Sequence, residues 1–181
     1  YRTTKPKGNS MKLYKILSKL LDYPEREIID NLDELIEIIN NSFEINQIEK
    51  ESLLTFINWM SKHSVIEIQQ EYVKTFDMIP DHSLHLTHHI FGDDKARGPA
   101  LIDLNEHFKS EGFEMKQGEI PDYLPLILEY ISTLNEIEAG TFLADANKIV
   151  KILTKNLSKA NSPFSELTKI LENRARRAEL T

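Results

Sequence analysis

The first half of this chain contains almost no glycine or proline, the two residues that most strongly interrupt regular structure. No glycine occurs between Asn9 and Phe91, and the only prolines in that span are Pro24 and Pro80. β-Hairpins need turn residues such as glycine at short intervals. We therefore expect this half of the chain to be helical.

Apolar side chains recur every three or four residues along the chain, which is the period of one face of an α-helix. The stripes lie at 13–21, 28–39, 53–60, 65–76, 101–108, 124–134, 142–157 and 164–175. No internal repeat or change of composition indicates a second domain. The sequence predicts an all-α fold, a single-domain bundle of about seven to nine helices over residues 11–181.

Several residues are expected to mark helix ends. Two pairs have the spacing of a capping box: Asn46 with Glu49, and Ser64 with Glu67. Gly112 suits the left-handed conformation that ends many helices. Asp122 is predicted to cap the next helix, because Pro125 then falls in the first turn, where a missing backbone donor costs little.

The composition excludes several classes of protein. With no cysteine among 181 residues, the chain cannot carry a disulfide framework, a thiolate zinc site, an iron–sulfur cluster or a cysteine nucleophile. No stretch approaches the ~20 apolar residues that a membrane helix requires. No serine lies in a glycine-flanked elbow, and the glycines form no phosphate-binding cluster. We expect a soluble, cytoplasmic protein with no stable membrane insertion and no dedicated active site.

The charge of the chain is negative, at −7 in total. Residues 1–10 hold three cations and no acid and precede Met11, so we interpret them as a remnant of an expression vector, and residues 11–181 then carry −10. Such a body is expected to avoid nucleic acid and to favour a basic partner. Three late cations are expected to lie at the C-terminus of the last helix: Arg174, Arg176 and Arg177.

Four of the six histidines lie between residues 77 and 99. If a short helix covers 83–91, His85 and His89 share a face at the i, i+4 spacing that lets two imidazoles hold one metal ion. A metal-dependent hydrolase would draw on the 82–94 cluster, with His85, His88, His89 and Asp93. The competing interpretation is that these histidines cap helices or form hydrogen bonds near a loop.

Acidic residues are concentrated in the same region. Six acids lie between Asp77 and Glu106, against only Lys95 and Arg97. They are suited to the rim of a groove that attracts a basic peptide. The alternative is that they are helix caps and solvated turns.

A series of short motifs resembles one protein family. The motifs are Leu20–Pro24, Tyr72–Asp77, Leu84–Asp93, Arg97–Leu101 and Glu119–Pro125. In this order and spacing they resemble the NarJ-type nitrate reductase assembly chaperones, also called delta subunits, within the TorD-like group of molybdoenzyme chaperones. The similarity runs from about Met11 to Tyr130.

The resemblance implies an all-helical cytoplasmic chaperone without catalytic activity. Such a protein binds the apo alpha subunit of respiratory nitrate reductase, including its N-terminal peptide, and holds it for molybdenum cofactor insertion and membrane docking. It binds no cofactor stably, but assists insertion of bis-molybdopterin guanine dinucleotide into the client. Further implied partners are molybdenum cofactor biosynthesis proteins and a second copy of the chain, with a hinge at 113–121. The remaining alternative is an acidic partner-binding helical module unrelated to nitrate respiration.

The resemblance also implies a client-binding site. The wider group carries an acid-proline-aspartate-histidine motif, which matches Glu119–Tyr123 with Tyr123 at the histidine position. Arg97 is expected to contact the peptide or to pair with Asp77 or Asp93. The full set of candidate peptide-binding residues is Tyr72, Phe76, Asp77, His89, Asp93, Arg97, Pro121, Asp122, Tyr123 and Pro125.

Overall fold

Helices account for nearly all the regular structure of the computed structural model, which describes residues 11–181. The predicted vector remnant at 1–10 lies outside the described residues. The helices are α1 (Lys12–Leu21), α2 (Arg26–Asp30), α3 (Leu32–Asn41), α4 (Gln47–Ser61), α5 (Val65–Tyr72), the π-helix η1 (Val73–Asp77), the 3-10 helix η2 (Pro80–His82), α6 (His88–Phe91), α7 (Arg97–Ser110), α8 (Leu124–Ser132), α9 (Glu136–Lys159) and α10 (Ser165–Glu179). No strand occurs within this span, so the predicted all-α fold is confirmed.

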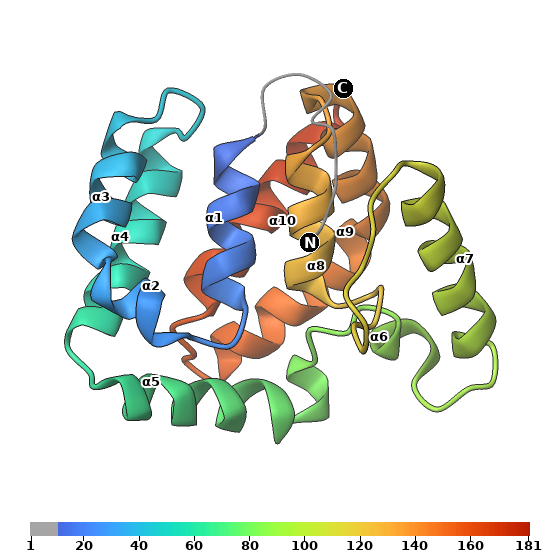
Figure 1. The fold of residues 1–181 in the computed structure, drawn as a ribbon, viewed down its shortest axis with the longest axis horizontal. Coiled ribbons are helices and arrows are strands. Elements are labelled where there is room, and N and C mark those ends of the chain that lie inside the picture. The colour runs from blue at the N-terminus through green and yellow to red at the C-terminus, as the bar shows by residue number, and fades with distance from the viewer. Residues whose placement is uncertain (1–10) are drawn as a thin grey trace.

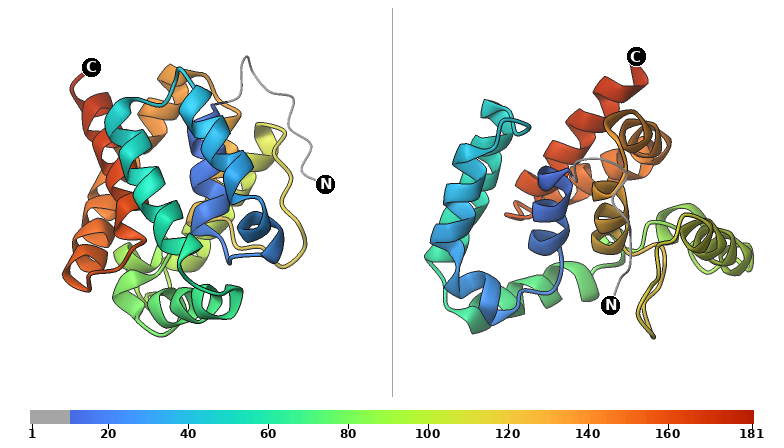
Figure 2. Two further views of the ribbon diagram at one scale, coloured as in Figure 1. Left: turned by 90° about the vertical axis from the view of Figure 1, so that its left-hand side faces the viewer. Right: turned by 45° about the horizontal axis from the view of Figure 1, so that its top comes forward.

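The helices pack around a central pair, α1 and α8 (Figure 1). The long helices α9 and α10 pack along each other on one side of this pair, and α10 also contacts α4. The α3–α4 hairpin lies on the other side, and α5 runs across one end of the bundle (Figure 1, Figure 2). No helix of residues 11–181 is long and apolar enough to cross a membrane.

Local sequence determines where several of these helices begin and end. Both predicted capping boxes are present. The Asn46 side chain accepts from the Glu49 amide, and the Ser64 side chain accepts from the Glu67 amide. In each box the glutamate carboxylate in turn accepts from the backbone amide of the capping residue. Gly112 has φ +76° after the last turn of α7, as its position predicts. At that end the Phe113 amide donates to the Phe108 carbonyl at 2.9 Å, which satisfies an orphan acceptor of the helix.

The structure has ten α-helices in its described part, slightly more than the predicted seven to nine. The stripe at 28–39 is divided at Asn31, which has φ −114° and ψ 26° between α2 and α3. Its side-chain amide donates to the Glu27 carbonyl at 2.7 Å, so the side chain competes with the helical ladder at this point. The apolar period continues across the break, which is why the sequence predicts one helix.

An ion cluster around the buried Glu49 carboxylate joins α4 to α10. The Arg174 guanidinium donates to both carboxylate oxygens of Glu49, at 2.6 and 2.9 Å, and Arg177 donates to Oε1 at 3.0 Å. Arg174 also donates to the Glu44 carbonyl at 2.9 Å. Burial alone would raise the pKa of Glu49, but the hydrogen bonds and charge of Arg174 hold it below its usual value. Arg174 and Arg177 therefore connect two helices that are far apart in the sequence. Their position near the end of the last helix does not predict this contact.

Among the helices of eight or more residues, α7 has the fewest buried side chains. It extends away from the central helices (Figure 2, right) and buries only Phe108 among its fourteen residues. The Phe108 ring packs against Tyr130 and Phe113, with centroid distances of 4.7 and 5.4 Å. The neighbouring His107 shares a hydrogen bond with the Tyr130 hydroxyl at 3.0 Å. One aromatic cluster thus attaches the end of α7 to α8.

Candidate functional site

A hollow of about 470 Å³ opens where the end of α1, the end of α5 and the loop before α8 meet. Four of the predicted peptide-binding residues line it together: Tyr72, Phe76, Asp77 and Tyr123. Three carboxylates, those of Asp22, Asp77 and Glu119, also lie among its lining residues, and within 11–181 neither a lysine nor an arginine lines it. The hollow therefore combines aromatic walls with negative charge.

The aromatic wall depends on the unusual end of α5. After Tyr72 the chain continues as the π-helix η1, a wider turn than the α-helix and frequent at functional sites. Tyr72 and Phe76 are both buried, with ring centroids 4.9 Å apart, and Phe76 packs on Phe164 of the α9–α10 connection at 4.8 Å. The Thr75 carbonyl bonds to His82 Nδ1 at 3.0 Å, which ties η1 to η2.

Two tyrosine hydroxyls connect the walls of the hollow. The hydroxyl oxygens of Tyr72 and Tyr123 are 2.6 Å apart. The Tyr72 hydroxyl is also 3.1 Å from the Leu21 carbonyl, and the Tyr123 hydroxyl is 2.9 Å from Asp22 Oδ1. Burial raises the pKa of both tyrosines far above the usual phenol value, so both are neutral hydroxyls at pH 7. Because two hydroxyls hold two protons, only two of these three contacts are hydrogen bonds at one time.

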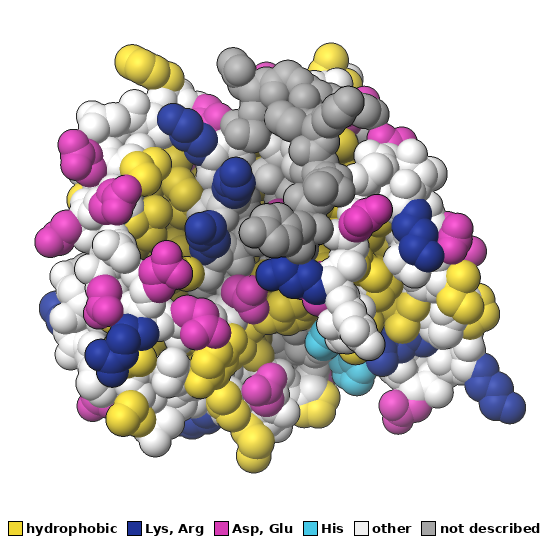
Figure 3. Space-filling model, viewed as in Figure 1, with side chains coloured by type: hydrophobic (Ala, Val, Ile, Leu, Met, Phe, Trp, Pro, Cys, Tyr) yellow, Lys and Arg dark blue, Asp and Glu magenta, His cyan; other side chains and the backbone are white. Residues whose placement is uncertain are grey.

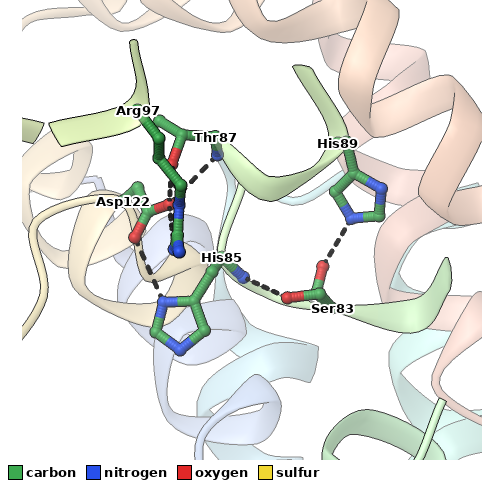
Figure 4. A network of polar contacts seen from close by, with 6 residues as sticks. All are labelled: Ser83, His85, Thr87, His89, Arg97 and Asp122. Carbon is green, nitrogen blue, oxygen red and sulfur yellow. Dashed lines mark hydrogen bonds and ion pairs between the residues drawn. The ribbon is translucent and has the colours of Figure 1, made fainter. Parts of the chain in front are cut away.

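Asp122 lies fully buried beside the hollow and organises the surrounding loops (Figure 4). Its carboxylate accepts from His85 Nδ1 at 3.1 Å, from the Thr87 amide at 3.0 Å and from the Thr87 hydroxyl. The Arg97 side chain donates through Nε to the Thr87 hydroxyl at 2.9 Å and places Nη2 at 3.5 Å from Asp122. Burial would raise the pKa of Asp122, but the hydrogen bonds from His85 and Thr87 hold it below its ordinary value.

Backbone pairing reinforces this arrangement. His85 and Tyr123 form an isolated antiparallel bridge, in which the Leu86 amide donates to the Asp122 carbonyl at 3.0 Å and the Leu124 amide to the Leu84 carbonyl at 2.8 Å. The second bond also satisfies one of the first amides of α8, which lacks a partner inside its own helix. The prediction that Asp122 caps α8 is therefore wrong: the N-cap is Tyr123, and the Asp122 side chain turns to the loop at 85–87 instead.

The remaining predicted residues lie outside the hollow. Pro121 and Pro125 are buried next to Asp122 and Leu124, where they shape the start of α8. Asp93 is exposed on the loop before α7. Arg97 pairs with Asp122 and Thr87, not with Asp77 or Asp93 as the sequence suggests. The structure thus divides the predicted peptide-binding residues into three groups. Some line the hollow, some support the loops beside it, and some lie away from it.

The histidines do not form the predicted helical pair. The helix expected over 83–91 is only the single turn α6, because His85 is extended in its bridge with Tyr123. His85 faces Asp122, whereas His89 Nε2 bonds to the Ser83 carbonyl at 2.7 Å (Figure 4). In residues 11–181 no three potential ligands come together in a metal-binding arrangement. The geometry therefore gives no support to a metal-dependent hydrolase.

Sequence reasoning missed several residues of the hollow. Asp22 and Tyr23 follow α1, while Glu119 and Ile120 lie on the loop before α8. Both pairs belong to motifs that carry the family resemblance, and their place in those motifs is the sequence feature that could have identified them. The two pairs come together only through contacts between residues about a hundred positions apart in the sequence, such as the hydrogen bond from the Tyr123 hydroxyl to Asp22.

Comparison with known proteins gives a consistent result. Residues 44–168 match the family described as nitrate reductase delta subunit. The chain is 30% identical over 156 residues to the nitrate reductase molybdenum cofactor assembly chaperone NarJ of Escherichia coli (strain K12), which covers 86% of this chain and 66% of that protein. It therefore spans about two thirds of the length of that relative.

Two further relatives extend the comparison. The chain is 33% identical over 162 residues to the probable nitrate reductase molybdenum cofactor assembly chaperone NarJ of Bacillus subtilis (strain 168), covering 87% of this chain and 85% of that protein. It is 25% identical over 154 residues to the nitrate reductase-like protein NarX of Mycobacterium tuberculosis (strain ATCC 25618 / H37Rv), covering 84% of this chain and 22% of that protein. These similarities lie across most of the described helices.

Proposed function

The chain belongs to the nitrate reductase delta subunit family, and from that premise we propose that it is a non-catalytic assembly chaperone for a respiratory nitrate reductase. It acts in the cytoplasm, binds the apo alpha subunit and holds it while the molybdenum cofactor is inserted and until the subunit docks at the membrane. It binds no cofactor stably itself. The similarity to nitrate reductase molybdenum cofactor assembly chaperones supports the role in assembly. The chemistry of the hollow supports the proposed mode of client binding.

The observation that carries this proposal is the chemistry of the hollow. A basic, partly apolar peptide meets carboxylates at Asp22, Asp77 and Glu119 and aromatic surface at Phe76 and the tyrosines. Long-range attraction brings such a peptide to the rim, while apolar contacts supply most of the affinity. The N-terminal segment of the alpha subunit is the proposed occupant.

The proposed affinity is moderate. A flexible peptide loses conformational freedom when it binds, and this cost offsets part of the interaction energy. The walls of the hollow, by contrast, are already held by the Tyr72, Tyr123 and Asp122 contacts, so the protein itself has little to reorganise. Moderate affinity permits release once the client has folded.

Titration calorimetry with the N-terminal peptide of a nitrate reductase alpha subunit tests the proposal. We expect a dissociation constant in the micromolar range for the full chain, and at least a tenfold weaker one for the double variant Asp22→Asn/Asp77→Asn. Asparagine keeps an oxygen that accepts from the Tyr123 hydroxyl, so the variant removes charge and preserves the local contact.

A matched control separates this site from general charge effects. The double variant Asp93→Asn/Asp103→Asn changes the net charge equally at exposed positions outside the hollow and is expected to bind as the parent does. Equal weakening in both variants, or no heat at high micromolar peptide, would contradict the proposed site. Affinity capture from anaerobic, nitrate-respiring cells tests the wider role, and capture that lacks the alpha subunit would leave only the helical partner-binding module.

A further inference from the structure

A second surface of the molecule has a different chemistry from the hollow. A groove of about 550 Å³ runs between α1 and the α2–α3 segment. Figure 3 shows this face with an apolar hollow flanked by a row of basic side chains over α1 and by acidic ones over α2 and α3. The residues that make the groove come from one short stretch of sequence, 12–38.

The basic wall is the whole solvent face of α1. Seven of its ten residues are buried, and the three that are exposed are Lys12, Lys15 and Lys19. Their spacing of three and four residues aligns them along one side of the helix. None forms an ion pair with any other residue in 11–181. Three ammonium groups are thus aligned along the groove without a carboxylate partner in that span.

The opposite wall and the floor complete an amphipathic surface. Glu27 and Glu34 stand seven residues apart on the α2–α3 side. Between the two charged walls, the floor contains Ile28 and Leu35, both partly exposed, and Ile38, which is 41% exposed. A continuous apolar strip between two lines of opposite charge is typical of a surface that receives an amphipathic helix.

We propose that this groove binds an amphipathic α-helix of a partner protein, one with an apolar stripe, an acidic edge and a basic edge. The acidic edge pairs with Lys12, Lys15 and Lys19, and the basic edge pairs with Glu27 and Glu34. The ten residues of α1 span about 15 Å, so a partner helix of roughly three turns matches its length. The acidic hollow attracts a basic peptide, whereas this groove requires acids along one edge, so it recognises a different segment.

A designed peptide tests the groove directly. The probe is a fluorescein-labelled helix of 14 residues with a leucine stripe, glutamates along one edge and lysines along the other. We expect the full chain to bind it, with the anisotropy signal weakening as salt is raised. The triple variant Lys12→Glu/Lys15→Glu/Lys19→Glu is expected to bind at least tenfold more weakly, because attraction on one wall becomes repulsion.

The chain supplies a closely matched control. Lys148, Lys151 and Lys155 are exposed on α9 with the same spacing as the three lysines of α1. Their triple replacement by glutamate changes the net charge identically and is expected to leave the probe affinity within twofold of the parent. A second probe has the same leucine stripe and lysine on both edges, and both probes are compared in the Asp22→Asn/Asp77→Asn background, where the hollow has lost two of its three carboxylates. There the second probe is expected to bind at least tenfold more weakly than the first.

Several outcomes would overturn the proposal. Equal losses in the two triple variants would mean that only net charge matters, and equal binding of both probes would mean that the lysine wall has no role. Sedimentation equilibrium that reveals a dimer abolished by Ile38→Asn would assign the groove to a second copy. Probe binding that appears only in a chain beginning at Met11 would assign it to the chain's own first ten residues. Asp22→Asn/Asp77→Asn is expected to leave binding of the first probe unchanged, because neither residue lines the groove, so this test is independent of the client-peptide test.

Discussion

Glu49 and Asp122 are both almost fully buried carboxylates, yet their partners differ. Glu49 lies between α4 and α10 and faces two guanidinium groups, those of Arg174 and Arg177. Asp122 lies between two loops beside the hollow and is held mainly by Thr87 and His85, with Arg97 at the longer distance of 3.5 Å. One carboxylate is compensated by permanent charge, and the other largely by hydrogen-bond donors.

The difference reflects what each region does. A bidentate arginine fixes both the distance and the orientation of two helices, which suits a contact deep in the bundle. The Asp122 cluster holds short loop segments around the wall of the hollow, where several weaker bonds keep the backbone in place. We expect the Glu49 region to control global stability and the Asp122 region to control both stability and peptide binding.

The largest expected effect is that of Arg174→Ala. The substitution leaves Glu49 buried with only Arg177 and a backbone amide as partners, which we expect to cost about 3 kcal/mol of unfolding free energy. Urea denaturation measures it. Arg176→Ala, on the same helix but exposed, is the control and should stay within about 0.5 kcal/mol of the parent. Similar losses of unfolding free energy in the two variants would show that the Glu49 ion cluster has no special role in global stability.

Asp122→Asn is expected to have the next largest effect. The amide nitrogen of asparagine cannot accept, so one of the donors at Thr87 or His85 loses its partner inside the protein, at a cost of about 2 kcal/mol. The same variant should weaken binding of the alpha-subunit peptide. Exposed Asp93→Asn is the control for both measurements. A variant as stable as the parent would show that the Asp122 charge contributes nothing to the fold.

Acid should reduce the difference between the parent and Asp122→Asn. The pKa of Asp122 is lower in the folded chain, so its contribution to stability is complete above its unfolded pKa of about 4 and is lost as the pH falls through the folded value. We expect the stability gap between the two proteins to shrink from about 2 kcal/mol at pH 7 to under about 1 kcal/mol near pH 3. A gap that widens in acid would contradict this sign.

Thr87→Val tests the smallest contribution in the series. The Thr87 hydroxyl donates to Asp122 and accepts from Arg97, so its loss should cost about 1 kcal/mol while the Thr87 amide bond persists. Exposed Thr141→Val on α9, where the hydroxyl bonds only within its own helix, is the control and should change stability by less than about 0.5 kcal/mol. Equal effects would mean that the Thr87 hydroxyl adds no more than an ordinary surface hydroxyl.

Much of the fold could be predicted because its signals are local. A capping box places both partners within three residues, so Asn46 and Ser64 identify two helix starts without any tertiary information. The break at Asn31 is also local, but the apolar stripe continues through it and conceals it. The order of the main helices was therefore predictable, whereas the division of the 28–39 stripe, the π-helix η1 at the end of the 65–76 stripe and the shortness of α6 were not.

The candidate site was less predictable because its contacts join distant parts of the sequence. Tyr72 bonds to Tyr123, and Asp122 bonds to residues about 35 positions earlier. The family motifs identified four wall residues of the hollow, but no pattern shows that His85 leaves the helical path to pair with Tyr123. For the same reason Glu49, read as a capping residue, gave no sign of Arg174, which is 125 positions away.

The loose attachment of α7 should permit local unfolding of this helix. Phe108 is its only buried side chain, and Arg97 at its first residue bonds to Thr87 and Asp122. With so few attachments, we expect this helix to detach at a cost well below that of unfolding the whole bundle. Its amide protons should then exchange with solvent deuterium earlier than those of α8, whose side chains are almost all enclosed. We therefore expect two cooperative units in hydrogen exchange, a slow-exchanging bundle and one helix that opens on its own.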